Sequence, residues 1–315
     1  MKKLTKISSR DLGLEFAAVC GRYFLGLEHL HYGYWSDGLE VNINNLRAAQ
    51  ENYTNFLVSH IPAEVRTILD VGCGSGQTSK RLVDMGYKVA CVSPSPVLSS
   101  RVKQLLGDEG QVFECPFEKL VTDDRFDLVL FSESFQYIRL KDAIEKTFEL
   151  LNPAGYLLIC DIFRKDLPSA EGKMNMGGGH RLSKFCGEIA NLPFELLQEV
   201  DITDRTIPNL DLLDEALRNV VRPMLDSGMD FLAGRYPLAS RLIRWFYRRR
   251  INAVYGKYFN GHRTGKDFEK FKTYRLFLYR AVSAVPAEPQ ALNLGLKQAL
   301  VRVGRYSDDS RLYVP

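Results

Sequence analysis

Between residues 67 and 163 the chain alternates short apolar runs with stretches in which apolar residues recur at helical spacing. The apolar runs are bounded by turn residues and have the length of buried strands. The expected strands are residues 67–71, 87–92, 111–115, 126–131 and 156–162, and the expected helices are 77–85, 96–106 and 140–151. Strands that alternate with helices predict a parallel sheet covered by helices on both faces.

After residue 163 the alternation is looser. Helical spacing continues over residues 182–190, and residues 194–202 and 273–281 are expected to add a sixth and a seventh strand. Three successive glycines favour a flexible loop over residues 173–180, and the long aromatic stretch at 210–260 has helical character. The expected parts are an N-terminal helical lid (1–60), a core (61–205 and 262–285), a helical cap insertion (206–261) and a tail (286–315).

Composition is that of an ordinary globular protein. Of the 315 residues, 45% are hydrophobic and 25% are charged, and every apolar run is interrupted well before the roughly 18 residues that a membrane span needs. The basic first residues lack the apolar stretch of a signal peptide. The six cysteines include no Cys-x-x-Cys pair. We therefore expect a cytoplasmic protein with reduced thiols.

The glycine-rich run Leu-Asp-Val-Gly-Cys-Gly-Ser-Gly at residues 69–76 follows an expected strand and opens an expected helix. Glycines let the backbone turn sharply and approach a ligand, and free N–H groups at a helix start can meet a carboxylate. The dinucleotide fingerprint Gly-x-Gly-x-x-Gly fails here, because the third glycine comes one residue early and Gln77 takes its place. Alone, such a run can also be a purely structural turn.

The glycine run and two later segments together resemble class I S-adenosylmethionine-dependent methyltransferases, in order and in spacing. The later segments are Arg-Phe-Asp-Leu-Val at residues 125–129 and Leu-Leu-Asn-Pro-Ala-Gly at residues 150–155. Leu-His-Tyr-Gly-Tyr-Trp at residues 30–35 resembles a segment of the small-molecule and lipid branch, which includes tocopherol methyltransferases and cyclopropane synthases. In that branch the segment folds over the cofactor; the alternative is an aromatic helix end packed in a core. The resemblance implies an α/β fold with a Rossmann-like, mostly parallel seven-stranded sheet, helices on both faces and a helical cap insertion.

The resemblance also implies a binding site for S-adenosylmethionine. Gly72, Gly74 and Gly76 would line its methionine part, Asp70 would shape the turn, and Tyr34 would reach its carboxylate end. The remaining residues expected to bind the cofactor are Cys73, Ser93, Pro94, Phe117 and Ser132.

Two positions depart from the usual pattern of the class. The acidic residue that holds the ribose hydroxyls is replaced by Ser93, and Ser93-Pro94-Ser95 is similar to the Thr-Leu-Ser of the tocopherol and cyclopropane branches. The glutamine that follows in those branches is absent, with Leu98 near its place. The acid that often recognises adenine is replaced by Pro116, which leaves Phe117 to offer a backbone N–H and a stacking surface.

The expected fourth strand ends in Ser-Glu-Ser-Phe-Gln-Tyr at residues 132–137, where ligands bind in open α/β sheets. Glu133 and Tyr137 resemble the Glu-Ser-x-x-His of tocopherol-type enzymes, so Glu133 is expected to orient the substrate or accept a proton; a simple loop cap is the alternative. His180 is the other catalytic candidate, because imidazole titrates near neutrality; a merely exposed loop histidine is the alternative. No metal site is expected, because the histidines show no ligand spacing. The Asn/Asp-Pro-Pro-Tyr/Phe sequence of amino methyltransferases acting on DNA bases is absent.

Charge is segregated along the chain. Residues 231–285 carry an excess of +11 and the remainder carries −7, with a basic, aromatic stretch from Arg241 to Arg250. Such a patch attracts anionic partners: an anionic group of the substrate, or an acidic membrane surface beside a lipid substrate, touched peripherally. The alternative is a helix packed by its apolar face with solvated arginines. No recognised RNA-binding appendage accompanies the patch, which argues against nucleic acid.

These patterns lead us to expect transfer of a methyl group from S-adenosylmethionine to a hydrophobic small molecule or lipid that can carry an anionic group. Two other hypotheses stay open. Ser93 and Pro116 suggest a non-catalytic binding protein that kept the fold, and the basic patch suggests an RNA methyltransferase.

Overall fold

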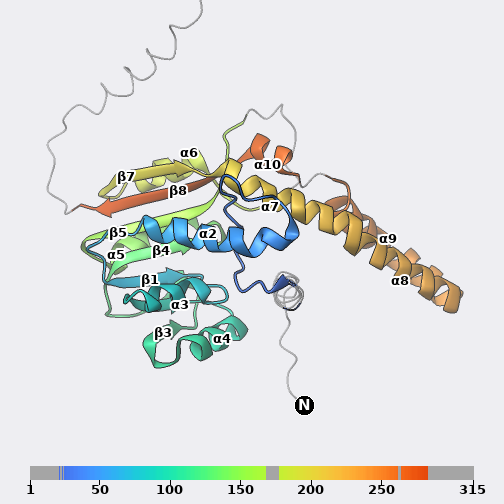
Figure 1. The fold of residues 1–315 in the computed structure, drawn as a ribbon, viewed down its shortest axis with the longest axis horizontal. Helices are drawn as coiled ribbons and strands as arrows, with labels where there is room; N and C mark the ends of the chain where they lie inside the picture. Colours follow the sequence, from blue (N-terminus) through green and yellow to red (C-terminus); the bar gives the residue numbers. More distant parts are fainter. Residues whose placement is uncertain (1–20, 22, 24, 168–176, 262–263, 283–315) are drawn as a thin grey trace, which may run out of the picture. The chain divides into compact units, whose positions relative to one another are not determined.

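The computed structural model describes residues 21, 23, 25–167, 177–261 and 264–282. Its sheet has the order β3-β2-β1-β4-β5-β8-β7 (Figure 1). The short strand β6 pairs with β5. The strands are β1 (Thr67–Val71), β2 (Lys88–Val92), β3 (Gly110–Phe113), β4 (Phe126–Ser132), β5 (Leu151–Arg164), β6 (His180–Arg181), β7 (Phe194–Asp201) and β8 (Lys272–Ala281). Strands β1 to β5 pair in parallel, and β8 runs antiparallel to β5 and β7. The predicted mostly parallel α/β fold is confirmed.

Helices connect the strands. The α-helices are α2 (Leu46–Ser59), α3 (Gln77–Asp84), α4 (Pro96–Leu106), α5 (Leu140–Leu150), α6 (Leu182–Ile189), α7 (Thr203–Ala216), α8 (Arg222–Arg235), α9 (Pro237–Tyr258) and α10 (Gly265–Phe271). The shorter turns are η1 (Ile43–Asn45), η2 (Gly107–Glu109), η3 (Phe117–Lys119), η4 (Phe135–Tyr137) and the π-helical η6 (Leu217–Val221). Helix α4 begins as its sequence predicts, because Ser95 caps its first turn and Pro96 is its first residue.

Each face of the sheet has its own apolar core. Successive side chains of a strand point to opposite faces, so Ile68 of β1 packs in one cluster with Leu57 of α2 and Leu82 of α3. Its neighbour Leu69 packs in the other cluster with residues of α5 and α6, among them Phe185. The sheet is therefore covered on both sides, as parallel strands require.

The chain order of the strands reverses between β1 and β4. From β1 the chain fills one half of the sheet with β2 and β3, and then returns to place β4 and β5 on the other side of β1. Asp127 holds the amino ends of β1 and β4 together, because its carboxylate accepts hydrogen bonds from the N–H groups of Arg66 and Thr67, both at 2.9 Å. Ligands of open α/β sheets bind beyond the opposite, carboxyl ends, at such a reversal.

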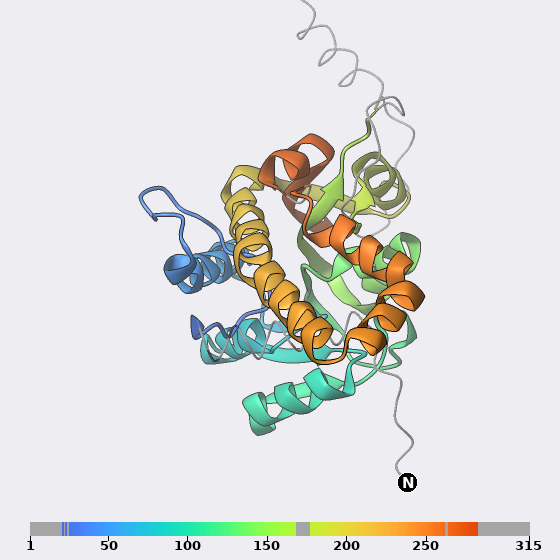
Figure 2. The ribbon, with the colours of Figure 1, turned by 90° about the vertical axis from the view of Figure 1, so that its right-hand side faces the viewer.

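Residues 203–258 form helices between β7 and β8. Helix α7, the turn η6 and helix α8 follow one another without a break, and α9 returns beside α8 (Figures 1 and 2). The hairpin of α8 and α9 leaves the sheet, and all residues from Arg241 to Arg250 are exposed. The expected role of residues 206–261 as a cap stays a prediction. In the described part of the chain, no helix has the length and apolar character needed to cross a bilayer.

Two local expectations are wrong. The fifth strand, expected at residues 156–162 after the turn residues Asn-Pro-Ala-Gly at 152–155, already begins at Leu151, which pairs with Phe126. A register shift after Phe126 and the positive φ of Ala154 accommodate the turn residues within the strand. His180 was expected in a loop but lies in β6, where it pairs with Phe163. Residues 173–176 of that loop, residues 1–20 of the expected lid and the tail 286–315 lie outside the described residues.

Candidate active site

The glycine turn joins β1 to α3 through three glycines in the left-handed region. The φ angles are 77° at Gly72, 56° at Gly74 and 83° at Gly76, which residues with a Cβ rarely adopt. A Cβ at Gly72 would also overlap the Cβ of Ser134 in the loop after β4. The Ser134 hydroxyl donates a hydrogen bond to the carbonyl oxygen of Val71. The glycine turn and the end of β4 are therefore locked against each other.

The turn leaves main-chain donors available. The Gly72 N–H donates to the carbonyl oxygen of Val92 at 2.8 Å, and the Gly76 N–H donates to that of Cys73 at 2.9 Å. Within the described residues, the N–H groups of Cys73, Gly74 and Ser75 have no backbone acceptor. They lie at the start of α3, where the helix dipole favours a carboxylate. This cradle fits the amino-acid part of S-adenosylmethionine.

Asp70 lies at the buried end of β1. Its carboxylate accepts a hydrogen bond of 2.6 Å from the Ser79 hydroxyl, which ties β1 to α3. Burial raises the pKa of Asp70 to about 6. The position agrees with the predicted role of shaping the turn; the role itself stays a prediction.

The predicted ribose and adenine contacts lie after β2 and β3. Ser93 is buried, its N–H donates to the Phe113 carbonyl at 3.0 Å, and its hydroxyl oxygen accepts from the Ser95 N–H at 3.3 Å. Its hydroxyl proton remains for a ligand, while Pro94 is exposed. The Phe117 ring is 2% exposed and packs edge-on against Phe131. The ring of Phe117 therefore packs in the core. The predicted contact of its backbone N–H with adenine stays a prediction.

Residues 30–35 lie against α2 and α7. Asn209 of α7 holds both polar groups of Gly33: its Oδ1 accepts from the Gly33 N–H at 2.8 Å, and its Nδ2 donates to the Gly33 carbonyl at 2.7 Å. The Trp35 N–H donates to the Arg205 carbonyl of α7 at 2.9 Å. The side chain of Leu30 reaches to 3.7 Å from where a Cβ of Gly74 would stand. This segment therefore covers the glycine turn.

The aromatic residues of this segment are anchored. Tyr34, predicted to reach the carboxylate end of the cofactor, stacks on Phe56 of α2 with ring centroids 5.0 Å apart. His31 is half-buried beside Tyr53, with ring centroids 4.4 Å apart, and desolvation lowers its pKa to about 3. His31 is therefore neutral at physiological pH, and its Nδ1 lies 2.8 Å from the carbonyl oxygen of Tyr32.

Glu133 follows β4 directly and has a φ of 55°, a conformation that is uncommon without glycine. Its Oε1 accepts hydrogen bonds from the Tyr32 N–H at 2.7 Å and from the Tyr274 hydroxyl at 2.8 Å. Burial raises the pKa of Glu133 to about 8, against these two hydrogen bonds, which lower it. Strained backbone and a strongly shifted carboxyl at one position are typical of functional sites.

Two buried tyrosines that the sequence did not single out extend this site. The Tyr274 hydroxyl of β8 lies 3.0 Å from that of Tyr53 in α2, which lies 3.1 Å from the hydroxyl of Ser132. One hydroxyl carries one proton, so when Tyr274 donates to Glu133 its oxygen accepts from Tyr53. The result is a chain of hydroxyls that ends at the Glu133 carboxyl.

The loop after Glu133 is fixed by a second buried carboxyl, Asp161 of β5. It accepts from the Gln136 N–H at 3.1 Å and from the Gln136 side chain at 2.8 Å, and burial raises its pKa to about 7. His180 of β6 contacts the same loop, with its Nε2 3.2 Å from the Phe135 carbonyl oxygen, and burial lowers the pKa of His180. Tyr137 is 62% exposed. The fold thus brings His180 to the loop of Glu133, while Tyr137 faces largely outward.

No group of three or more His, Cys, Asp or Glu residues suited to a metal ion occurs among the described residues. The site consists instead of a glycine turn after β1, a carboxyl after β4 and an N-terminal segment that covers both. Together with the strand order, these features define the class I S-adenosylmethionine-dependent methyltransferases.

Comparison with known proteins agrees with this class. Residues 69–159 match the family described as methyltransferase domain. The uncharacterized methyltransferase YodH of Bacillus subtilis is 30% identical over 120 residues, which are 36% of this chain and 52% of that protein. A probable chloroplastic tocopherol O-methyltransferase of Oryza sativa is 25% identical over 174 residues, 50% of this chain and 48% of that protein. The chain thus spans about half the length of these curated relatives.

Solved structures share the fold over most of the chain. A putative sarcosine dimethylglycine methyltransferase of Galdieria sulphuraria superposes with a TM-score of 0.62 at 16% identity, covering 86% of this chain and 99% of that one. A cyclopropane synthase of Mycobacterium tuberculosis superposes with a TM-score of 0.58 at 16% identity, covering 79% of this chain and 89% of that one. The geranyl diphosphate C-methyltransferase of Streptomyces coelicolor, solved with S-adenosyl-L-homocysteine, superposes with a TM-score of 0.58 at 17% identity. This match covers 83% of this chain and 92% of that one. Residues 69–159 therefore match a methyltransferase domain, and the chain shares its fold with methyltransferases of known structure, one of them solved with S-adenosyl-L-homocysteine.

Proposed function

We propose that this chain transfers a methyl group from S-adenosylmethionine to a hydrophobic small molecule or lipid. The observation that carries the proposal is the position of Glu133: its carboxyl follows β4, next to Ser134, which packs against Gly72 of the glycine turn. A carboxyl at this point faces whatever binds beyond the carboxyl ends of β1 and β4.

When bound, S-adenosylmethionine supplies an electrophilic methyl group on a sulfonium. The main-chain N–H groups of Cys73, Gly74 and Ser75 would hold its amino-acid part, and Leu30 would exclude water above Gly74. The buried hydroxyl of Ser93 would donate to the ribose. Holding both reactants in one orientation is the main requirement of an in-line displacement.

Glu133 is proposed to accept the proton of the acceptor group. Its Oε1 is occupied by Tyr32 and Tyr274, which leaves Oε2 for the acceptor. A carboxylate with a pKa of about 8 is a far stronger base than an exposed one. Tyr274 and Tyr53 fix the orientation of the carboxyl and stabilise its charge through their hydrogen bonds.

The relatives support the apolar character of the acceptor. The tocopherol O-methyltransferase and the geranyl diphosphate C-methyltransferase, by their names, act on tocopherol and on geranyl diphosphate, which both have long apolar parts. In this chain the group around Glu133 is rich in aromatic side chains, since Tyr32 and Tyr274 pack with ring centroids 6.3 Å apart. An apolar acceptor would displace water from this carboxyl; the ionised form of Glu133, a minority at neutral pH and the majority above about pH 8, would then accept the proton.

The cofactor site is tested by replacing Gly74 with arginine and measuring the binding of S-adenosylhomocysteine by calorimetry. The wild-type protein is expected to bind, and Gly74→Arg is expected to lose binding, because the new side chain would fill the cradle. Gly187→Arg is the matched control, since a side chain at Gly187 of α6 meets nothing within 4 Å. Equal binding by Gly74→Arg and the control would refute the site.

A non-catalytic binding protein is the second candidate, favoured by Ser93 in place of the usual acid and by the core position of the Phe117 ring. The two candidates are separated by incubating the protein with labelled S-adenosylmethionine and a lipid or metabolite extract. Label in a product made by the wild-type protein, and absent with Glu133→Gln, supports the enzyme. Cofactor binding without any labelled product supports the alternative. Labelled product in total RNA would favour an RNA substrate instead.

A further inference from the structure

The outward face of α9 is apolar. Leu238, Leu242, Trp245 and Phe246 are 74%, 65%, 74% and 73% exposed. Their spacing of four, seven and eight residues from Leu238 places them on one side of the helix. Arg241 joins three of them around a shallow hollow. In a soluble protein such side chains normally occur singly, and a continuous group marks a binding surface.

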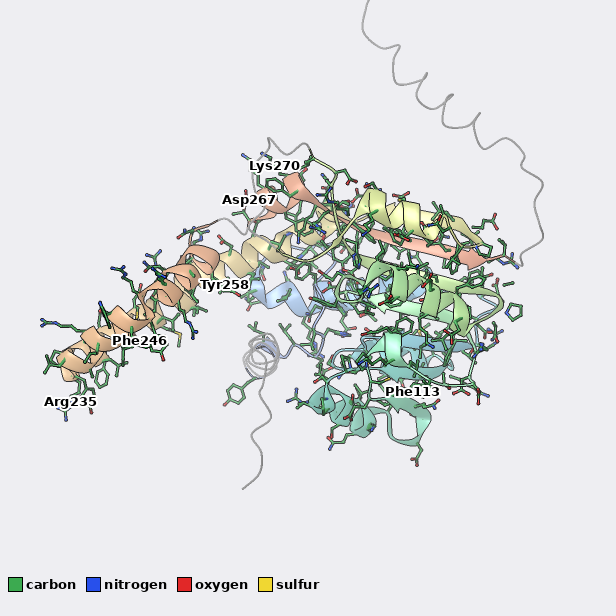
Figure 3. All side chains as sticks on the ribbon, turned by 180° about the vertical axis from the view of Figure 1, so that it is seen from behind. Phe113, Arg235, Phe246, Tyr258, Asp267 and Lys270 are labelled. Atoms are coloured by element: carbon green, nitrogen blue, oxygen red, sulfur yellow. The ribbon has the colours of Figure 1, made fainter. Side chains whose placement is uncertain are left out.

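The opposite side of α9 already has a partner. The Tyr255 hydroxyl donates a hydrogen bond of 2.6 Å to Asp226 of α8, and Arg244 lies 3.8 Å from Asp230 of α8. Packing of the hairpin therefore does not explain the outward face. Figure 3 shows the hairpin with Arg235 at its far end, Phe246 partway along and Tyr258 near the sheet.

The exposed apolar face is surrounded by positive charge. Helix α9 contains five arginines and one lysine and no acidic residue. Arg249 lies eleven residues after Leu238, on the outward side, and Arg241 and Arg248 flank that side. The two aspartates of α8 near α9 are already engaged by Tyr255 and Arg244. The surface therefore offers apolar side chains and positive charge together.

We propose that the α8–α9 hairpin docks on the surface of an anionic lipid bilayer. Leucine, tryptophan and phenylalanine would enter the boundary between headgroups and acyl chains, while the arginines would meet lipid phosphates. A polyanion such as RNA pairs with arginines but gives exposed leucines no apolar contact. A second copy of this chain, bound through its own α9, would bring the arginines of the two helices close together. The lipid surface is thus the partner whose chemistry matches both features.

Trp245 provides a direct readout, because the chain has two tryptophans and the other, Trp35, is 3% exposed. The experiment adds vesicles of phosphatidylcholine mixed with phosphatidylserine to the full chain without cofactor, and follows tryptophan emission and cosedimentation. The expected result is a blue shift and pelleting with the mixed vesicles and neither with phosphatidylcholine alone. Trp245→Phe should remove the blue shift.

Paired variants separate the two contributions. Leu242→Ser with Phe246→Ser should weaken the apparent vesicle affinity at least tenfold, and Arg248→Gln with Arg249→Gln should do the same and reduce its salt dependence. Val121→Ser, at a position 91% exposed outside the hairpin, is the control and should bind as the wild type does. Because the assay needs no cofactor, its result is independent of the proposed methyl transfer.

Three results would overturn the docking proposal. The first is no binding to the mixed vesicles, and the second is equal binding by the paired variants and the control. The third is a tighter complex with total RNA, or a self-associated form in sedimentation velocity, that depends on Leu242 and Phe246 and competes with vesicles.

Discussion

Replacing Glu133 by glutamine changes one property of the site, the ability of this carboxyl to ionise. The amide has the same size, and its oxygen can still accept from the Tyr32 N–H and the Tyr274 hydroxyl. The variant should therefore keep the local packing, while the free energy of unfolding loses the pH dependence that Glu133 contributes.

The sign of that dependence follows from the raised pKa. The pKa of Glu133 is about 8 in the folded protein, against 4.5 for an ordinary glutamate. Between these values the folded state holds a proton that the unfolded chain has lost, so the contribution is fully present below about pH 4.5 and is lost as the pH rises through about 8. For this pair of values, raising the pH from about 5 to about 7.5 removes about 3 kcal/mol of stability.

The assay is urea unfolding of both proteins at these two pH values, followed by the fluorescence of the buried Trp35 in a background where Trp245 is phenylalanine. The stability of Glu133→Gln should fall by about 3 kcal/mol less than that of the parent over this range. Glu195→Gln, at an exposed position, is the control and should follow the parent. The same loss in Glu133→Gln and in the parent would refute the reasoning, because Glu133 would then titrate as an ordinary surface carboxyl.

Two other changes test neighbouring parts of the site. Gly72→Ala should destabilise the fold by about 3 kcal/mol, because Gly72 has a positive φ and a Cβ there would overlap Ser134. The control Gly187→Ala places its Cβ in open space and should be neutral or slightly stabilising. Equal shifts of the two variants in thermal melts would contradict the packing argument. Asn209→Ala leaves both polar groups of Gly33 without their partner, so hydrogen exchange across residues 25–35 should rise at least tenfold; unchanged exchange there would mean that another contact holds the segment.

The part of the fold that the sequence predicts well is local. Residues 67–163 combine short apolar runs with turn residues, so the order of β1 to β5 and the start of α4 at Pro96 follow from neighbouring residues alone. The glycine turn was predictable because positive φ angles select glycine. Glu133 could be proposed as a site residue from its place after β4. Its left-handed backbone conformation could not be predicted, because the residue is not a glycine.

What the sequence could not predict depends on distant contacts. Tyr53 and Tyr274 are separated by 221 residues and meet only because α2 lies against β5 and β8; a tyrosine in an amphipathic helix or a strand gives no separate signal. The ring of Phe117 turned into the core because Phe131 offers it an apolar neighbour. His180 pairs with Phe163 as a strand although three glycines precede it, because β5 extends beyond its last pair with β4, Cys160 with Ser132, and is open to pairing on that side.

Helix α7 has a consequence for how the cofactor enters and leaves. Asn209 and Arg205 of this helix hold the segment whose Leu30 reaches over Gly74, and the same helical run continues through the π-turn Leu217–Val221 into α8. A π-turn has a weaker hydrogen-bond ladder than the helices on either side, so bending concentrates there. A change of angle between α7 and α8 at this π-turn would therefore act on the helix that holds residues 30–35, and so would couple the position of the α8–α9 hairpin to the cover over Gly74.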